Sequence, residues 1–212
     1  MPDNDYQFEF DREPDEVRPT IYRSDRQVRF NEAQIADLKE NFDKNASVVQ
    51  RGTKSQRAMN RNQFRNIMGV LGQNETPFLA DRVFDIFDED MDGKLLFDEF
   101  KWIMDILCNG TEEERHQFSF RLMDLQDRGW INFQSFLNYF TKVINHWSSL
   151  INKQIKLQRE VLESIFNQID TDRDGKIKCK EYSRALVSNP KLLDWFKILS
   201  QDRTTFETLR LK

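Results

Sequence analysis

Two twelve-residue stretches carry oxygen ligands at the spacing that a hard divalent cation requires. Residues 88–99 hold aspartates at positions 1, 3 and 5, a glycine at position 6 and a glutamate at position 12, and residues 170–181 repeat this pattern. Calcium takes about six to eight oxygens, which short carboxylates, one main-chain carbonyl at position 7 and a bidentate glutamate can supply. We therefore expect two calcium sites. Their ligands are Asp88, Asp90, Asp92, Lys94, Glu99, Asp170, Asp172, Asp174, Lys176 and Glu181, with both lysines contributing only carbonyl oxygens.

Positions 12 and 9 of these loops predict which ion binds and how tightly. A bidentate glutamate at position 12 builds a large cage and so favours calcium over magnesium. Position 9 holds Leu96 in the first loop and Lys178 in the second. Leucine cannot orient a bound water, and lysine places a positive charge near the ion. We expect dissociation constants of about 10⁻⁷ to 10⁻⁵ M.

Helical periodicity flanks both loops. Apolar residues occur one, four, five and eight positions before each loop, as expected of an amphipathic entering helix. They are Ala80, Val83, Phe84 and Phe87 before the first loop, and Leu162, Ile165, Phe166 and Ile169 before the second. Exit helices are predicted to begin near Phe100 and Tyr182. Each loop therefore belongs to a helix–loop–helix unit.

A third stretch has the length and the glycine of such a loop but lacks most of its ligands. Residues 124–135 begin with an aspartate and hold Gly129 at position 6. Positions 3, 5 and 12 are Gln126, Arg128 and Ser135. A cation at position 5 and no carboxylate at position 12 predict that this loop does not bind calcium.

The most N-terminal unit is altered further. Ile35, Leu38 and Phe42 form an apolar stripe that predicts an entering helix, and Asp43 begins a loop-like run. A basic, polar stretch, residues 48–57, then intervenes before the exit pattern. Because 21 residues run from Asp43 to Gln63, this segment is too long for a twelve-residue cage, and we expect no ion there.

Composition excludes several classes of protein. The net charge is −4, so no basic excess exists to meet nucleic-acid phosphates. No apolar run reaches the roughly 18 residues of a membrane span, and the termini show no signal peptide or lipidation motif, so we expect a cytoplasmic protein without membrane insertion. Cys108 and Cys179 lack metal-ligand spacing and are expected to be thiols.

The terminal segments leave alternatives open. Residues 1–30 begin acidic, with aromatic residues interleaved, and then become basic. This pattern is compatible with a disordered tail or with an extended arm that docks on a partner. Near the other end, residues 192–199 predict a short apolar helix that covers its own lobe or binds a partner. Residues 141–160 are expected to extend the exit helix of the third unit and lead into the fourth.

Other residues give no catalytic constellation. The chain has only two histidines, no glycine-rich phosphate loop and no nucleophile with a plausible base, so we predict that it is not an enzyme and nominate no catalytic or organic-cofactor residue. Trp130 lies inside the incomplete third loop. Contact with a partner and filling of the vacant cage are both compatible with this position.

The loops and their flanks are typical of the EF-hand calcium sensor superfamily. Within it, the runs 60–68 and 81–88 resemble the calaxins, EF-hand proteins of ciliary outer dynein arms related to neuronal calcium sensors and calcineurin B. This resemblance covers about residues 37–186 and implies a sensor that helps dock dynein on the doublet microtubule of the ciliary axoneme. Two features depart from the calaxin pattern: the lost ligands of residues 124–135, and residues 1–30, which have no counterpart.

Together these inferences predict an all-α fold with two lobes of paired EF-hands. The predicted divisions are an arm, 1–30; a first pair, 31–108; a second pair, 111–188; and a C-terminal helix and tail, 189–212. We expect a calcium-binding regulatory or adaptor protein that binds helical partners, such as the dynein-arm docking complex or other axonemal proteins. The alternatives are a calcineurin-B-like regulatory subunit of a soluble enzyme, and a static structural component whose calcium sites only stabilise the fold.

Overall fold

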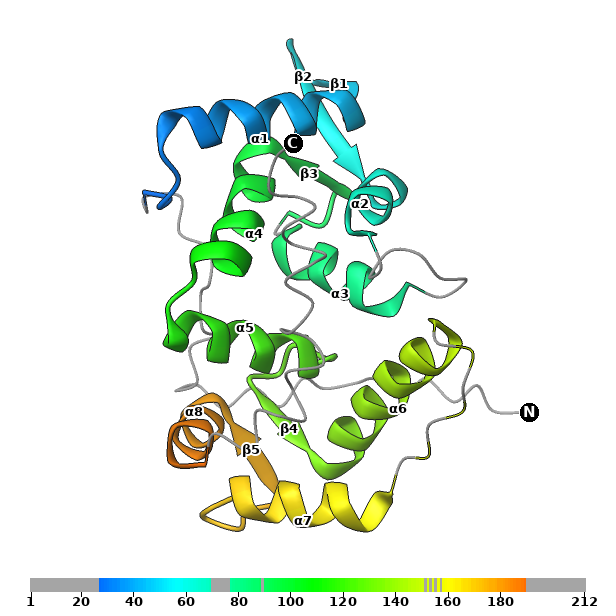
Figure 1. Ribbon diagram of the computed structural model, residues 1–212, viewed down its shortest axis with the longest axis vertical. Helices are drawn as coiled ribbons and strands as arrows, with labels where there is room; N and C mark the ends of the chain where they lie inside the picture. The colour runs from blue at the N-terminus through cyan, green and yellow to red at the C-terminus, as the bar shows by residue number, and fades with distance from the viewer. Residues whose placement is uncertain are drawn as a thin grey trace, which may run out of the picture.

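The computed structural model describes residues 27–69, 77–88, 90–150, 152, 154, 156 and 158–189. This part of the chain is mostly helical, with short strands between the helices (Figure 1). The elements are α1 (Glu32–Asn45), β1 (Ser47–Arg51), β2 (Lys54–Asn60), α2 (Arg61–Ile67), α3 (Phe78–Phe87), β3 (Lys94–Leu96), α4 (Phe97–Asn109), α5 (Glu112–Met123), β4 (Trp130–Asn132), α6 (Phe133–Leu150), α7 (Arg159–Ile169), β5 (Lys176–Lys178) and α8 (Cys179–Ser188). None of the helices in these ranges combines the length and the apolar character needed to cross a membrane.

Side chains just before the helices fix where several of them begin. Asn31, Asn60 and Thr111 are N-caps whose side chains accept the backbone N–H three residues later. In each case the residue at that third position returns a side-chain acceptor to the N–H of the cap, which completes a capping box. The capping box at Thr111 gives Glu114, the third residue of α5, a structural role.

Two small sheets join the four helix–loop–helix units in pairs. Strand β3 of the second unit pairs antiparallel with β2 of the first, and β4 of the third pairs with β5 of the fourth. Buried residues lie opposite one another at the centre of each pair, Met59 with Leu95 and Ile131 with Ile177. The described residues are thus mostly helical, as expected, and they also form a three-stranded and a two-stranded sheet that the all-α prediction did not include.

The long segment in the first unit is a β-hairpin rather than an irregular insertion. Strands β1 and β2 pair from Ser47 with Ala58 to Arg51 with Lys54, which leaves a two-residue turn. Gly52 in this turn has φ +61°, a conformation that glycine adopts without steric cost. At the base of the hairpin, Nη1 of Arg57 donates to the carbonyls of Asp43 and Ala46 at the end of α1. In this unit the hairpin stands where the complete units have a twelve-residue loop.

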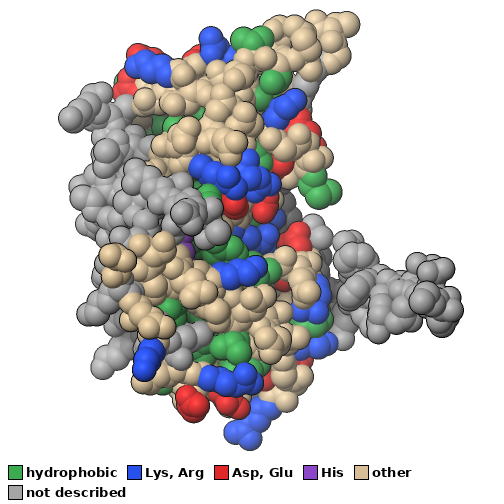
Figure 2. All heavy atoms as spheres, turned by 90° about the vertical axis from the view of Figure 1, so that its right-hand side faces the viewer, with side chains coloured by type: hydrophobic (Ala, Val, Ile, Leu, Met, Phe, Trp, Pro, Cys, Tyr) green, Lys and Arg blue, Asp and Glu red, His purple; other side chains and the backbone are tan. Residues whose placement is uncertain are grey.

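A single hydrophobic core extends through all four units. Phe87 of α3 contacts Phe118 of α5, and Phe78 contacts Tyr139 of α6, so the second unit packs directly on the third. In Figure 1, α3 and α5 lie at the middle of the molecule, between the α1–α4 end and the α7–α8 end. On the face in Figure 2, acidic and basic side chains are intermixed and the hydrophobic ones form small groups.

Arginines also join the second and third units. Arg82 of α3 donates to the carbonyls of Arg121 (2.7 Å), Leu122 (3.4 Å) and Asp124 (2.5 Å) at the end of α5. In the other direction, Nη2 of Arg121 donates to the carbonyl of Ile86 near the end of α3 (3.4 Å). Burial lowers the pKa of Arg82, and three aspartates oppose this effect. The two entering helices are thereby tied together beside their loops.

Arg29 holds the segment before α1 against the junction of α4 and α5. Its backbone N–H and Nη1 donate to Asp105, each at 3.0 Å, and Nη2 donates to Glu114 at 2.6 Å. Asp105 is fully buried and Glu114 is 8% exposed. Burial alone would raise the pKa of Glu114, but its hydrogen bonds to Thr111 and Arg29 outweigh this and lower it.

Several expectations concern residues that the structure describes only in part. Most of the arm, residues 1–26, and the apolar helix at 192–199 lie outside the described residues. The exit helix of the third unit does extend past residue 141, but α6 ends at Leu150. Residues 152, 154, 156 and 158 are not helical, so no single helix runs from 141 to 160.

Candidate metal centres

Each complete loop is shaped by hydrogen bonds from its own backbone to its first aspartate. In the loop between α3 and α4, Oδ1 of Asp88 accepts the N–H of Asp92 at 3.1 Å, and Oδ2 accepts the N–H of Gly93 at 3.0 Å. Gly93 has φ +75°. In the loop between α7 and α8, Oδ2 of Asp170 accepts the N–H of Gly175 at 3.0 Å, and Gly175 has φ +80°. Glycine at position 6 therefore allows the reversal that brings the later ligands back to the first.

This turn gathers three carboxylates in each loop. One oxygen each of Asp88, Asp90 and Asp92 lies within 4.8 Å of the others, and the same holds for Asp170, Asp172 and Asp174. In both groups the first aspartate is buried and the other two are exposed. Burial raises the pKa of Asp88 and of Asp170, and the neighbouring aspartates add to the rise. Three carboxylates held this close repel one another, and a divalent cation would relieve that repulsion.

One oxygen of the fourth unit supports the fit of a cation directly. Oδ1 of Asp170 is buried and has no hydrogen-bond partner among the described residues. A buried, unpartnered carboxylate oxygen is costly, so such atoms call for a specific explanation. The donor set around it consists of carboxylate oxygens, which are the ligands that calcium prefers. The residues of this loop thus fit a hard divalent cation.

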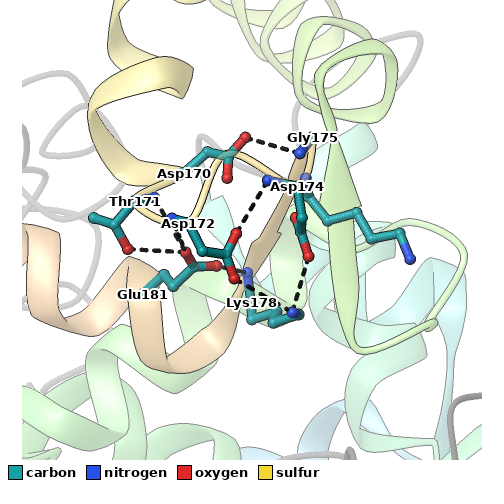
Figure 3. A network of polar contacts seen from close by, with 8 residues as sticks. Asp170, Thr171, Asp172, Asp174, Gly175, Lys178 and Glu181 are labelled. Carbon is teal, nitrogen blue, oxygen red and sulfur yellow. Dashed lines mark hydrogen bonds and ion pairs between the residues drawn. The ribbon is translucent and has the colours of Figure 1, made fainter.

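The position-12 glutamates are not members of the two aspartate groups, and they differ from each other in their hydrogen bonds. Oε2 of Glu99 accepts the N–H of Leu96, which caps its own helix α4. Glu181 caps α8 in the same way but also reaches across its loop, where Oε1 accepts the N–H and the hydroxyl of Thr171 (Figure 3). The fourth unit therefore already carries its glutamate next to the start of the loop.

Lys178 at position 9 contacts two of the candidate ligand carboxylates of the fourth unit. Its Nζ lies 2.9 Å from Oδ2 of Asp174 and 3.7 Å from Oδ2 of Asp172 (Figure 3). The hydrogen bond to Asp174 is the main cause that lowers the pKa of that carboxyl. Lys178 therefore competes with any cation for these two aspartates. Leu96 holds the equivalent position in the second unit and offers no such charge.

The two position-7 residues lie on the paired strands. Lys94 begins β3 and Lys176 begins β5, each directly after the loop glycine. The pairing of Asn60 with Lys94 and of Asn132 with Lys176 fixes their main chains against the neighbouring unit. Their carbonyls are thus carried by the sheets rather than by the aspartate turn.

The third loop keeps the same turn without the ligands. Oδ1 of Asp124 accepts the N–H of Arg128 at 3.1 Å, and Oδ2 accepts the N–H of Gly129 at 2.7 Å. Nη2 of Arg128, at position 5, donates to Oγ of Ser135, at position 12, at 3.2 Å. Gln126 at position 3 is exposed. Burial raises the pKa of Asp124. A guanidinium and a hydroxyl thus meet where the complete loops carry carboxylates.

Trp130 packs against basic side chains of two units. Its ring stacks on the guanidinium of Arg128 at 3.8 Å, and Nζ of Lys176 lies 4.8 Å from the ring centroid. The side chain is half-buried between the third and fourth units. Sequence reasoning left its role open, because Lys176 is 46 residues away along the chain (176 − 130) and only the β4–β5 pairing brings it near.

The fold and these loops define a helix–loop–helix protein of the calcium-binding type, and comparison with known proteins agrees. A model of the EF-hand domain pair matches residues 113–187, and a model of the single EF hand matches residues 79–104. The calcium-binding protein NCSA of Dictyostelium discoideum is 30% identical over 146 residues, which cover 68% of this chain and 77% of that protein. The chain belongs to the EF-hand family.

Two further relatives are more distant. Human calaxin is 27% identical over 140 residues, which cover 65% of each protein. Calcineurin B of Schizosaccharomyces pombe is 27% identical over 144 residues, covering 66% of this chain and 78% of that protein. The calaxin match thus leaves about a third of each protein outside it.

Proposed function

We propose that the protein is a calcium-binding regulatory or adaptor protein with two calcium sites. The first site uses the carboxylates of Asp88, Asp90, Asp92 and Glu99 and the carbonyl of Lys94. The second uses the carboxylates of Asp170, Asp172, Asp174 and Glu181 and the carbonyl of Lys176. The observation that carries this proposal is the convergence of three carboxylate oxygens within 4.8 Å in each loop, with a glutamate at position 12 at the start of the exit helix.

The proposed response to calcium follows from where the glutamates lie. Glu99 and Glu181 are in the first turns of α4 and α8. An ion that takes both oxygens of such a glutamate competes for the oxygen that now accepts the N–H of its own helix cap. The first turn of the exit helix then moves with the carboxylate. Such a shift is how calcium changes the angle between paired helices in sensor EF-hands.

Calorimetric titration of the full chain with calcium tests the two sites. The wild-type protein should bind two ions with dissociation constants of about 10⁻⁷ to 10⁻⁵ M. E99Q and E181Q should each bind one ion in that range, because glutamine offers one oxygen where glutamate offers two. E163Q changes an exposed glutamate of α7 and should bind two. Two ions bound to the E99Q/E181Q double variant would refute the assignment.

We further propose that the protein binds helical partners, and that these belong to the ciliary axoneme. The likeness to calaxin supports this assignment, as does the pairing of each complete loop with an ion-independent one. In such a fold two of the four units need no ion, so they can bind a partner at low calcium. Calcium binding to the other two units can then change the affinity for that partner. Cross-linking and mass spectrometry of the native complex, with and without a chelator, should identify dynein-arm or tubulin neighbours.

Two other functions predict different neighbours. The likeness to calcineurin B favours a regulatory subunit of a soluble enzyme, for which one phosphatase or kinase would dominate the cross-links. A static structural component would bind its partner equally well in the wild-type and the E99Q/E181Q forms. In all three cases the protein itself is proposed to have no catalytic activity.

A further inference from the structure

We propose that Arg128 is a positioning residue for the calcium site of the fourth unit. It bridges the third loop where the complete loops use an ion, and it acts on the fourth loop through Trp130 and Lys176. This inference rests on the proposed calcium site at Asp170, Asp172, Asp174 and Glu181.

The third loop makes the same turn as the complete loops but lacks the carboxylates that would bind an ion. Another group must therefore connect the loop to its exit helix. Its first aspartate accepts the same two backbone N–H groups as Asp88 does in the second unit. Gly129 has φ +83°, close to the values of Gly93 and Gly175. In a complete loop the ion links position 5 to position 12 and so joins the loop to its exit helix. No carboxylate stands at either position here.

Arg128 supplies that link. Its backbone is held at position 5 by Asp124, and its guanidinium donates to Ser135 at position 12, in the first turn of α6. The hydrogen bond is 3.2 Å long and the guanidinium also lies on the Trp130 ring. A covalently attached cation of this kind does not leave when calcium falls. The link between the third loop and α6 therefore does not depend on calcium.

Arg128 and the strand β4 that follows it are connected to the fourth loop in two ways, through side chains and through the backbone. The side-chain route is the Trp130 ring, which makes cation–π contacts with Arg128 at 3.8 Å and with Lys176 at 4.8 Å. The backbone route is the β4–β5 pairing, with Asn132 opposite Lys176. Lys176 is the position-7 residue whose carbonyl is a proposed ligand. Fixing its side chain reduces the conformational entropy that the fourth loop must lose when it closes on an ion.

The direction in which calcium affinity changes when Arg128 loses its charge distinguishes positioning from long-range electrostatics. Removing a positive charge near a calcium site should strengthen calcium binding if only long-range repulsion matters. If Arg128 positions Lys176, its removal should weaken binding although the site becomes more negative. R128M keeps the aliphatic stem and removes both the charge and the donors, whereas R128K keeps the charge.

The experiment measures calcium affinity in the full chain carrying E99Q, so that only the fourth unit is titrated. We expect R128M to weaken binding at least about fivefold, the lower end of typical coupling between sites. R128K should lie between R128M and the parent. R184M removes an exposed charge from α8 and serves as the matched control, with affinity unchanged or slightly higher. An R128M affinity equal to or tighter than that of the parent overturns the proposal.

A second variant keeps the proposal testable if R128M does not fold. In Q126D/R128D/S135E, otherwise carrying the wild-type sequence, the third loop regains carboxylates at positions 3, 5 and 12. It should bind three calcium ions, with the fourth unit at least as tight as in the wild type, because an ion now makes the link that Arg128 made. A stoichiometry of two overturns the inference. Calcium binding by E99Q/E181Q would instead refute the underlying calcium sites.

Discussion

Removing the Arg29 side chain should destabilise the whole molecule, although this residue precedes the first helix. Arg29 supplies the positive charge that faces Asp105, whose side chain is 1% exposed, and it also bonds Glu114. In R29M the main-chain N–H of residue 29 and Nδ2 of Asn109 remain as donors to Asp105. The carboxylate then stays buried without an opposite charge.

The burial of the two side chains determines how much unfolding free energy R29M should lose. Breaking a fully buried ion pair by removing one partner costs about 3–5 kcal/mol. The side chain of Arg29 is 36% exposed, so water screens part of the interaction and about 2–3 kcal/mol remains. Methionine preserves most of the contact that the aliphatic stem makes with the surface. With a urea slope of about 2 kcal/mol per M, the midpoint should fall by about 1–1.5 M.

Urea unfolding followed by circular dichroism, with a chelator in every sample, measures this change. K44M is the control, because Lys44 pairs with Glu40 on the exposed face of α1 and should shift nothing measurable. R29M/D105N removes the buried charge as well and should recover part of the loss. The reasoning about Asp105 fails if R29M unfolds at the same urea concentration as K44M.

Further predictions concern single side chains. In K178M the fourth unit should bind calcium about 1.4- to fivefold more tightly, since exposed ion pairs contribute about 0.2–1 kcal/mol; calorimetry in the E99Q form measures it. Burial lowers the pKa of His116 below its ordinary value of 6.5, against the opposing charges of Glu112 and Glu113, so the neutral ring stabilises the fold above that pH. This contribution should be lost as pH falls below 6.5, and urea midpoints of H116Q should decline less between pH 7.5 and about 5 than those of the wild type. G52A should cost about 1 kcal/mol in thermal unfolding because residue 52 has φ +61°, and G52N should cost less.

The sequence predicted most of what depends on fixed spacing. The complete loops, their entering helices and the lost ligands at Gln126, Arg128 and Ser135 follow from a twelve-residue pattern and a helical period. These features are local, so neither distant residues nor packing can shift them. The model of the EF-hand domain pair, which matches residues 113–187, agrees with this interpretation of the second half.

The hairpin in the first unit was missed because its signal is weak. Residues 47–60 are mostly polar or basic, with apolar side chains at 48–49 and 58–59, and only Gly52 marks the turn. The strands form because β2 continues into a pair with β3, which holds Met59 and Leu95 in the core. A strand that depends on a partner more than 30 residues away leaves little trace in its own composition.

Contacts between distant side chains could not be read from spacing either. Arg29 with Asp105, Arg82 with the end of α5, and Trp130 with Lys176 all join units that only the folded core brings together. Each involves an arginine or lysine that composition alone assigns to the surface.

The two arginines between α3 and α5 have a consequence for how the two proposed calcium sites would act on each other. Arg82 and Arg121 connect the ends of two helices that lead into different loops. Any shift of α3 that accompanies ion binding must then be shared with α5, which in turn packs on α8 through Ser119 and Tyr182. Coupling of this kind is reciprocal: each ion changes the affinity for the other by the same factor. If both proposed sites bind calcium, the saturation curve should be steeper or shallower than that of two independent sites, and substitution of Arg82 or Arg121 should change its width.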